Sequence, residues 1–283
     1  MRYVFMRFPN FLSKAVTLSY DDGVIYDKKL IEIMDRNGLK GTFNLNSGMF
    51  GVKRRMLREE ALALYTDSGH EVAVHGKNHL SLAELQPAMI CDEILNDRIA
   101  LEEMFGTVIN GMAYAGGSFD DKAVEVLKHC GIDYARTVVS TEKFEIPTDW
   151  LRMPTTCHHS NPRLMELARA FAEGAPSIYY WGRTPRLFYL WGHTYEFHDN
   201  DNWHIIEEFA EYIGNREDIW YATNGEIYRY VKAYDSLQFS ANGERVYNPS
   251  AIDVYLNYYD DQFVVPAGAT VPLRKPSACE ARN

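Results

Sequence analysis

Apolar residues recur along the chain in two alternating patterns. Short continuous apolar runs, such as AVTLSY at 15–20, are typical of buried strands, and stretches with apolar residues at helical spacing follow them. Strands are predicted at 15–20, 41–46, 70–76, 109–114, 133–138, 186–193 and 219–223, and helices at 26–37, 57–66, 87–105, 120–129, 203–213 and 224–233. Strands that alternate with helices predict parallel β-α-β units, and this many predict a barrel or a doubly wound sheet.

The pattern changes after Tyr234. The turn signals ANGE, NPS and PAGA separate short apolar runs there, which is typical of β-hairpins. We therefore predict an α/β domain over residues 1–234 and a small β-rich appendage over 235–283. The end of that appendage, 274–283, is expected to form a loose tail.

Composition narrows the classes of function. The net charge is −10 and no basic face stands out in the sequence to neutralise phosphates, which argues against a nucleic-acid partner. Polar residues interrupt the N-terminal apolar stretch, so neither a signal peptide nor a membrane span is expected, and a cytoplasmic location is the simplest inference. A chain trimmed of its leader would look the same. Cysteines form no C-x-x-C pair and predict no cysteine metal site; they are Cys91, Cys130, Cys157 and Cys279. The sequence does not address the oligomeric state.

Polar residues stand at the ends of several predicted strands. The first strand ends in Asp21 and Asp22, and the third ends in HGKNH, which carries His75 and His79. The fourth runs into the glycine-rich AYAGGSFD, and the strand at 186–193 ends in His193. Because the carboxyl ends of parallel strands meet at one edge of a sheet, we expect these groups to lie close together.

Two histidines and one carboxylate are a common ligand set for a catalytic divalent metal. HGKNH lacks the internal Glu of H-E-x-x-H, so a metalloprotease helix is not indicated. Taken alone, the Asp pair also fits a solvated turn, and the His pair also fits a structural role. Their convergence at one sheet edge favours a metal site.

Three of these motifs resemble those of the polysaccharide deacetylases of the NodB-homology type, carbohydrate esterase family 4. The family motif T/S-F-D-D-G corresponds to SYDDG, H-S/T-x-x-H corresponds to HGKNH, and the catalytic His after an apolar strand corresponds to LWGHTYEF. The resemblance spans most of residues 15–230. It implies a distorted (β/α)7 barrel. The small C-terminal β appendage is predicted separately, from the residue pattern after Tyr234.

The resemblance also implies a role for each site residue. Asp22, His75 and His79 would bind the metal, Asp21 would be the general base, and His193 would be the general acid. Zn²⁺ suits this ligand set best, and Co²⁺, Ni²⁺, Mn²⁺ or Fe²⁺ could occupy the same ligands. The residues expected to bind the oxyanion or the substrate are Gly116, through its backbone N–H, Tyr114 and Trp191.

The chain departs from the family pattern in its third motif. Ala113 stands where the family carries the Arg that orients the base, and either Arg136 or Arg152 could supply that guanidinium from another strand. Gly76 replaces the usual hydroxyl residue between the two metal-binding histidines.

Near His193 the chain lacks the Asp often found beside the catalytic His of the family. Glu196 is the candidate to orient His193, although an ordinary polar loop residue is the alternative. His158 and His159 precede another helix, and they either line a substrate cleft or serve a structural or capping role.

The leading hypothesis is a metal-dependent hydrolase that removes acetyl groups from N-acetylated or O-acetylated sugars in oligo- or polysaccharides. It would use metal-activated water, with an Asp base and a His acid. The expected partner is an acetylated carbohydrate. An amide or imide hydrolase on the same barrel and a non-catalytic carbohydrate-binding protein are the alternatives.

Overall fold

A parallel sheet forms the centre of the molecule in the computed structural model, which describes residues 4–174, 184–258 and 261–273. The strand order is β7-β6-β5-β4-β3-β2-β9-β8, and β10 also pairs with β2. These strands are β2 (Lys14–Asp21), β3 (Gly41–Leu45), β4 (Glu71–Val74), β5 (Gly111–Ala113), β6 (Tyr134–Ser140), β7 (Met153–Thr155), β8 (Cys157–His158), β9 (Arg186–Gly192) and β10 (Trp220–Tyr221).

One extended segment, 153–158, joins the two ends of this sheet. Its first part, β7, pairs with β6, and its second part, β8, pairs with β9. Between them the backbone N–H of Thr156 donates to the carbonyl of Tyr189 at 2.9 Å. The sheet therefore closes on itself through β7 and β8. The register shift between β6 and β7 makes this closure irregular, in agreement with the predicted distorted barrel.

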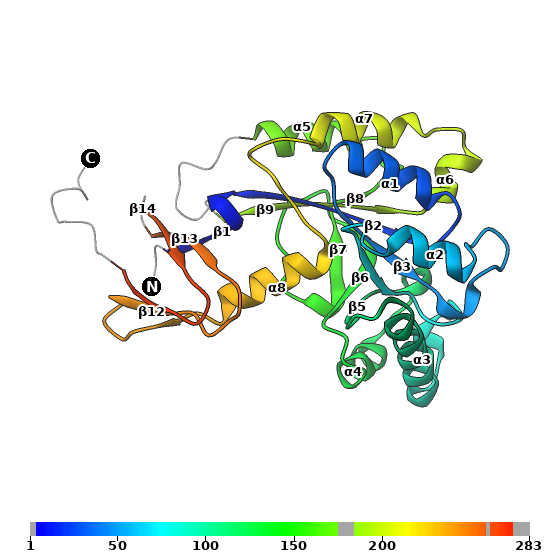
Figure 1. Ribbon diagram of the computed structural model, residues 1–283, viewed down its shortest axis with the longest axis horizontal. Coiled ribbons are helices and arrows are strands. Elements are labelled where there is room, and N and C mark those ends of the chain that lie inside the picture. The colour runs from blue at the N-terminus through cyan, green and yellow to red at the C-terminus, as the bar shows by residue number, and fades with distance from the viewer. Residues whose placement is uncertain (1–3, 175–183, 259–260, 274–283) are drawn as a thin grey trace.

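Helices cover the outside of the sheet (Figure 1). They are α1 (Asp27–Arg36), α2 (Arg58–Tyr65), α3 (Pro87–Phe105), α4 (Asp121–His129), α5 (Leu164–Glu173), α6 (Thr194–Asp199), α7 (His204–Ile213) and α8 (Asn224–Asp235). Each predicted strand and helix range contains an element of the expected type. The predicted ranges did not include β7, β8, α5 or α6. β7, β8 and α6 are short, whereas α5 is the helix that was expected after His158 and His159 without bounds.

Strand β2 lies between neighbours on both sides, β3 and β10 on one and β9 on the other. All eight of its residues are buried. A strand covered on both faces favours a continuous apolar run over strict alternation, which is the pattern of AVTLSY. Burial of the whole strand carries its polar C-terminal end into the interior, and this places Asp21 there.

The C-terminal segment forms two small sheets beside the barrel, at the opposite end of the view from α2 (Figure 1). Their strands are β1 (Val4–Arg7), β13 (Val254–Tyr258) and β14 (Asp261–Val265) in one, and β11 (Gln238–Phe239), β12 (Arg245–Tyr247) and β15 (Thr270–Pro272) in the other. β1 pairs antiparallel with β13, so the N-terminal strand packs on the C-terminal segment. The domain boundary at 234 stays a prediction.

The predicted tail, 274–283, lies outside the described residues and includes Cys279. The other three cysteines, Cys91, Cys130 and Cys157, are free thiols. Among the residues that the structure describes, none of the helices combines the length and the apolar character needed to cross a membrane.

Candidate active site

The two adjacent aspartates at the end of β2 point in different directions. Asp21 is the last residue of the strand and is 2% exposed. Asp22 follows it with φ of 81°, in the left-handed region, and its backbone N–H donates to the carbonyl of Asn44 at 3.0 Å. This turn separates the two carboxylates, so they can contact different partners.

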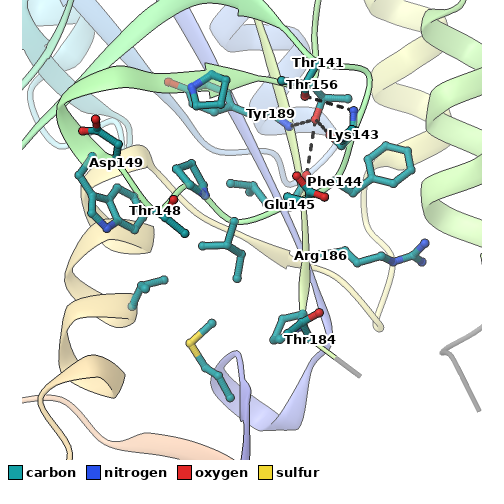
Figure 2. Close-up of a pocket in the computed structure, with 18 of the residues that line it drawn as sticks. Thr141, Lys143, Phe144, Glu145, Thr148, Asp149, Thr156, Thr184, Arg186 and Tyr189 are labelled. Atoms are coloured by element: carbon teal, nitrogen blue, oxygen red, sulfur yellow. Dashed lines mark hydrogen bonds between the residues drawn. The ribbon is translucent and has the colours of Figure 1, made fainter. Parts of the chain in front are cut away.

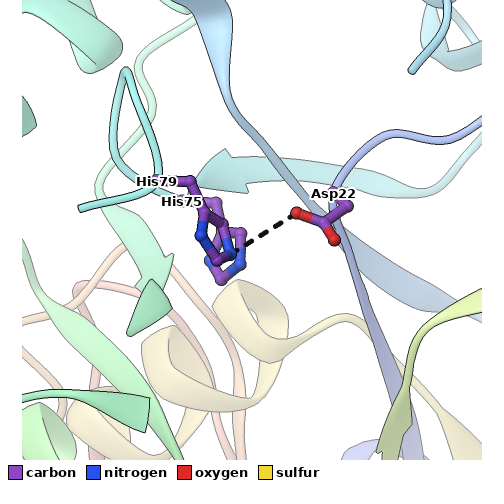
Figure 3. Close-up of side chains that lie close together, drawn as sticks. All are labelled: Asp22, His75 and His79. Carbon is purple, nitrogen blue, oxygen red and sulfur yellow. Dashed lines mark ion pairs between the residues drawn. The ribbon is translucent and has the colours of Figure 1, made fainter. Parts of the chain in front are cut away.

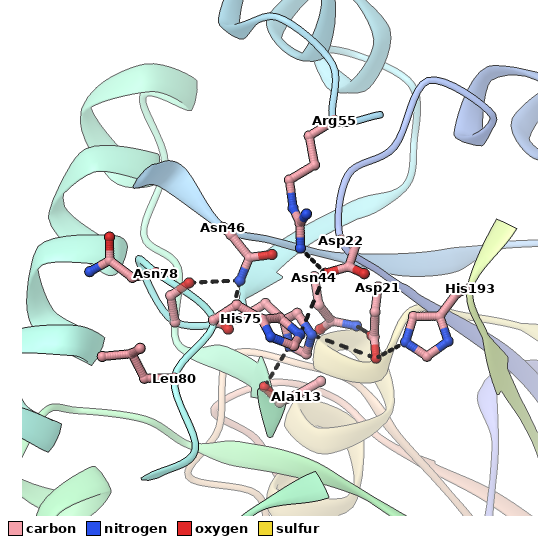
Figure 4. A network of polar contacts seen from close by, with 12 residues as sticks. Asp21, Asp22, Asn44, Asn46, Arg55, His75, Asn78, Leu80, Ala113 and His193 are labelled. Atoms are coloured by element: carbon pink, nitrogen blue, oxygen red, sulfur yellow. Dashed lines mark hydrogen bonds and ion pairs between the residues drawn. The ribbon is translucent and has the colours of Figure 1, made fainter. Parts of the chain in front are cut away.

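Asp21 lies among polar side chains that come from four other strands or directly follow them, and Figure 4 shows three of these side chains, Asn44, His75 and His193. Its Oδ1 accepts a hydrogen bond from Asn44 Nδ2 at 2.8 Å, and its Oδ2 forms an ion pair with Arg136. The Nε2 atoms of His75 and His193 each lie 3.8 Å from the same Oδ2. Asp21 therefore occupies the space between these two histidines, with its carboxylate held from two sides.

Electrostatics keep Asp21 ionised. Burial by itself raises the pKa of this carboxyl, but the nearby charge of Arg136, with His75 and His193 after it, outweighs burial and lowers the pKa to about 2. A carboxyl with this pKa is ionised across the neutral pH range.

Asp22, His75 and His79 bring one ligand atom each within 4.8 Å of one another (Figure 3). His79 Nε2 lies 3.5 Å from Asp22 Oδ1, and the ring centroids of the two histidines are 4.9 Å apart. His75 is fully buried, whereas the side chain of His79 is 32% exposed. The three residues predicted as metal ligands thus meet at one place.

The chemistry of His75 fits a metal ligand. Its Nδ1 lies 2.9 Å from the carbonyl oxygen of Ala113, which can only accept, so Nδ1 carries the hydrogen. Nε2 is then left with its lone pair, and this buried atom has no hydrogen-bond partner among the described residues. A carbonyl that fixes the tautomer of a histidine in this way is the usual support for metal-ligating histidines.

Helix α3 holds the HGKNH loop through two buried carboxylates. Asp97 accepts hydrogen bonds from the backbone N–H groups of Ser47 at 2.7 Å and His75 at 3.1 Å. Glu93 accepts from Asn78 N at 2.6 Å. Gly76 has φ of 79°, and a Cβ there would lie 3.0 Å from Glu93 Oε1. Glycine at this position therefore leaves room for Glu93, which explains the departure from the family motif.

Arg136, not Arg152, contacts the candidate base. Arg136 lies on β6, in register with Ala113 on β5, and its side chain is fully buried. The family carries this arginine at the position of Ala113, on β5. Here the guanidinium reaches Asp21 from the neighbouring strand, β6. Arg152 instead pairs with Asp121 and Asp149 at the surface, so its assignment to the base is wrong.

Replacing Arg136 with methionine is expected to lower the free energy of unfolding of the metal-free protein by about 3–5 kcal/mol at neutral pH, because Asp21 would be left buried without an opposite charge. Folding lowers the pKa of Asp21, so its ionised form stabilises the folded state. This stabilisation is complete above the pKa of Asp in the unfolded chain, about 3.9, and is lost as pH falls toward the folded-state pKa of about 2. Urea denaturation measures the loss. If Arg136→Met costs as much in an Asp21→Asn background as in the wild type, the two side chains are not coupled.

The residues expected to bind the oxyanion or the substrate differ in whether they are free to contact a ligand. Tyr114 donates its backbone N–H to Arg136 O and its hydroxyl to Leu151 O, and its ring stacks on Phe119. Because Tyr114 is also buried, its assignment as an oxyanion or substrate residue is wrong. Gly116 has φ of 59°, and a Cβ there would meet no atom within 4 Å, so open space adjoins it.

Trp191 is packed under the site rather than presented to solvent. It is 8% exposed, and the guanidinium carbon of Arg136 lies 4.5 Å from the centroid of its ring. Its ring also contacts the rings of His158 and His193 edge-on. This packing supports Arg136 and leaves little of the indole face for stacking against a sugar.

Glu196 contacts His193, as expected from its position. The distance from His193 Nδ1 to Glu196 Oε1 is 3.3 Å. Burial lowers the pKa of His193, but Glu196 and then Asp21 outweigh burial, so the pKa is raised. The remaining histidines of this region, His158 and His159, contact Glu196 rather than capping a helix.

Sequence reasoning missed Arg55. Its Nη2 lies 2.6 Å from Asp22 Oδ1, the oxygen that also faces His79 (Figure 4). Arg55 is in the segment between β3 and α2, far from any of the strand-end motifs, and no spacing signal marks it. Arg55 thus places a positive charge beside the Asp22 carboxylate.

A cavity of about 1070 Å³ lies elsewhere in the molecule (Figure 2). It is lined by β1, by much of segment 141–156, and by the C-terminal half of α8. Asp21, Asp22, His75, His79 and His193 are not among its lining residues. The cavity is therefore separate from the candidate active site.

Residues 9–135 match the family model described as "Polysaccharide deacetylase". This segment, less than half of the chain, is similar to the polysaccharide deacetylase family. The match contains Asp21, Asp22, His75 and His79, and it ends one residue before Arg136. It therefore covers the predicted base and metal ligands of the family, but neither the arginine that holds the base nor His193.

Two curated relatives have deacetylase names. The "Probable peptidoglycan-N-acetylglucosamine deacetylase" of Arthroderma benhamiae is 33% identical over 102 residues, which is 34% of this chain and 21% of that protein. The chitin deacetylase of Pestalotiopsis sp is 27% identical over 147 residues, which is 49% of this chain and 46% of that protein. The chain thus spans less than half the length of either relative.

Solved structures of the family share the fold. The Xyl-CE4 domain of a multidomain xylanase from a Trinervitermes trinervoides hindgut metagenome has a TM-score of 0.54 and 14% identity, over 82% of this chain and 99% of that one. A mutant of BA3943, described as a CE4 family pseudoenzyme with restored enzymatic activity, has a TM-score of 0.50 and 16% identity, over 79% of this chain and 70% of that one. These structural similarities support the fold and the barrel assignment. They carry no information about the catalytic activity of this chain.

Proposed function

We propose that this chain is a metal-dependent deacetylase that hydrolyses N-acetyl or O-acetyl groups on sugars of an oligo- or polysaccharide. One observation carries the proposal: Asp21 Oδ2 lies 3.8 Å from Nε2 of His75, on the side of the metal ligands, and 3.8 Å from Nε2 of His193 on the other side. A base placed between a metal-ligand set and an acid suits hydrolysis of an acyl group.

Asp22, His75 and His79 would hold the metal, with Zn²⁺ the first choice for two imidazoles and a carboxylate. When bound, a divalent ion supplies Lewis-acid activation of water and of the acetyl carbonyl. Asp21 accepts the proton of the attacking water through Oδ2, which Arg136 keeps ionised. Gly116 offers its backbone N–H to the oxygen that becomes negative, beside open space. His193 donates a proton from Nε2 to the departing amine or alcohol.

The site has a buried floor and a partly exposed rim. Asp21, His75 and Arg136 are buried, whereas the side chains of His79 and His193 are 32% and 20% exposed. A substrate can therefore approach the metal ligands and the acid from solvent, while the base stays in a low-dielectric environment. Such an environment strengthens the interactions that orient the base.

Acetate release tests the proposal. Purified protein loaded with Zn²⁺ or Co²⁺ should release acetate from acetylated chitooligosaccharides, and comparison with an O-acetylated xylan separates amide from ester preference. Hydrolysis of a simple cyclic imide or primary amide without acetate release would favour the amide or imide hydrolase. Oligosaccharide binding without turnover of any of these substrates would favour the binding protein.

A further inference from the structure

Glu196, near the start of α6, faces three imidazole rings. Its Oε2 lies 2.7 Å from His159 Nε2 and 3.2 Å from His158 Nε2, and its Oε1 lies 3.3 Å from His193 Nδ1. Burial raises the pKa of Glu196, but the three histidines outweigh it and hold this pKa well below its usual range. None of these three contacts has hydrogen-bond geometry, and His193 Nδ1 and Glu196 Oε2 have no hydrogen-bond partner among the described residues, so the contacts are electrostatic. The negative charge of the carboxylate favours a hydrogen on each nitrogen that faces it.

The surroundings of His158 decide which of its nitrogens carries the hydrogen. Its Nδ1 accepts the backbone N–H of Ser160 at 3.2 Å and lies 2.7 Å from Ser160 Oγ. The hydrogen of the neutral ring is therefore on Nε2, which faces Glu196. His158, His159 and Glu196 bring their ligand atoms within 4.8 Å of one another, but a metal would need the lone pair that this hydrogen occupies. The geometry favours a charge contact over a second metal site.

Packing holds the ring of His159 in place. This residue is 2% exposed, and its ring stacks on Phe197, with the centroids 4.0 Å apart, and on Tyr20, with the centroids 5.8 Å apart. A side chain at Gly192 would overlap the His159 ring, so glycine at that position makes room for it. Because the ring has little freedom, it fixes the position of the Glu196 carboxylate that contacts it.

We propose that His158 and His159 are positioning residues, which hold Glu196 so that it keeps the hydrogen of neutral His193 on Nδ1 and directs Nε2 toward Asp21. His193 Nε2 lies 3.8 Å from Asp21 Oδ2 (Figure 4). The inference rests on the proposed function, in which Nε2 serves the leaving group. When His193 is protonated, Glu196 retains the Nδ1 hydrogen and the Nε2 hydrogen is the one that can be donated.

The test is ¹⁵N NMR of the histidine rings in labelled protein, at a pH where His193 is neutral. The wild type should show His193 with hydrogen on Nδ1. A His158→Phe, His159→Phe variant keeps two aromatic rings but removes both N–H groups, and the His193 hydrogen should then redistribute toward Nε2. We expect kcat for acetate release to fall about 10- to 100-fold with KM unchanged, as for other outer partners of site residues.

Two further variants sharpen the comparison. His158→Gln, His159→Gln restores an N–H at each position and should recover the Nδ1 tautomer of His193 and most of kcat. His129→Gln removes a histidine whose side chain is 79% exposed on α4, and it should leave both readouts unchanged. If the double Phe variant does not fold, Glu196→Gln tests the same tautomer, because this side chain is partly exposed.

An unchanged His193 tautomer in the double Phe variant and in Glu196→Gln overturns the inference. So does a second equivalent of tightly bound metal that the double Phe variant alone loses, since His158 would then be a ligand. Failure of the proposed function is a separate result, because the tautomer is read without substrate. Acetate release with an unchanged tautomer defeats only this inference.

Discussion

Replacing His75 and His79 together with alanine is expected to lower the bound divalent metal from about one equivalent to none and to abolish acetate release. The physical reason is that the pair supplies two of three ligands, and one remaining carboxylate, Asp22, binds a divalent transition metal weakly. Metal analysis of protein loaded with Zn²⁺ and then desalted measures the first effect, and the acetate assay measures the second.

The matched control is His129→Ala, which removes an exposed histidine on α4 and should keep the full metal content. Circular dichroism and urea denaturation establish that the double variant is folded. If the double variant retains its equivalent of metal, the assigned ligand set is wrong. If the wild type takes up no Zn²⁺ or Co²⁺, the metal-dependent mechanism is wrong, and metal-free hydrolysis or binding would become the better account.

Replacing Asp21 with asparagine is expected to lower kcat by about 10²–10⁴-fold while the metal stays bound, because the variant removes the base and none of the ligands. Asparagine has nearly the same shape, and its side-chain oxygen can still accept from Asn44. The amide nitrogen would face the guanidinium of Arg136, so some loss of stability is also expected. Steady-state kinetics beside metal analysis separates these effects.

Asp22→Asn is the comparison variant, since it changes the neighbouring carboxylate and should weaken metal binding instead. The contrast between adjacent residues distinguishes a base from a ligand more sharply than either variant alone. Undiminished turnover in Asp21→Asn would remove Asp21 from the mechanism. Loss of metal in Asp21→Asn to the same extent as in Asp22→Asn would assign both aspartates to the metal site.

Several features of this protein could be predicted from its sequence alone. Apolar runs and helical spacing located most of the strands and helices of the barrel, because each of these segments buries a face whose period reflects its own backbone geometry. The site motifs are also local: Asp21 and Asp22 are adjacent, and His75 and His79 are four residues apart. Their placement at strand ends predicted that they would meet, since parallel strands end at a common edge.

Other features depended on contacts between distant segments. Because Ala113 replaces the family's arginine, another residue was expected to contact Asp21, but the sequence did not distinguish Arg136 from Arg152. Strand register decided between them, because pairing of β5 with β6 places Arg136 beside Ala113 in the interior. Arg55 reaches the site from the irregular segment between β3 and α2, and His158 reaches it from the two-residue strand β8. Neither segment is long enough in regular structure for periodicity to predict where its side chains point. The closure of the barrel through 153–158 depends in the same way on hydrogen bonds to two separate strands.

The sequence by itself therefore determined the alternating α/β architecture, the order of the motifs and the identity of the metal-ligand candidates, because these are encoded in spacing over a few residues. Only the tertiary structure decided which arginine holds Asp21, that Tyr114 is committed to packing, and that three histidines surround Glu196. Those outcomes follow from register, burial and loop direction, which arise when segments more than twenty residues apart pack together.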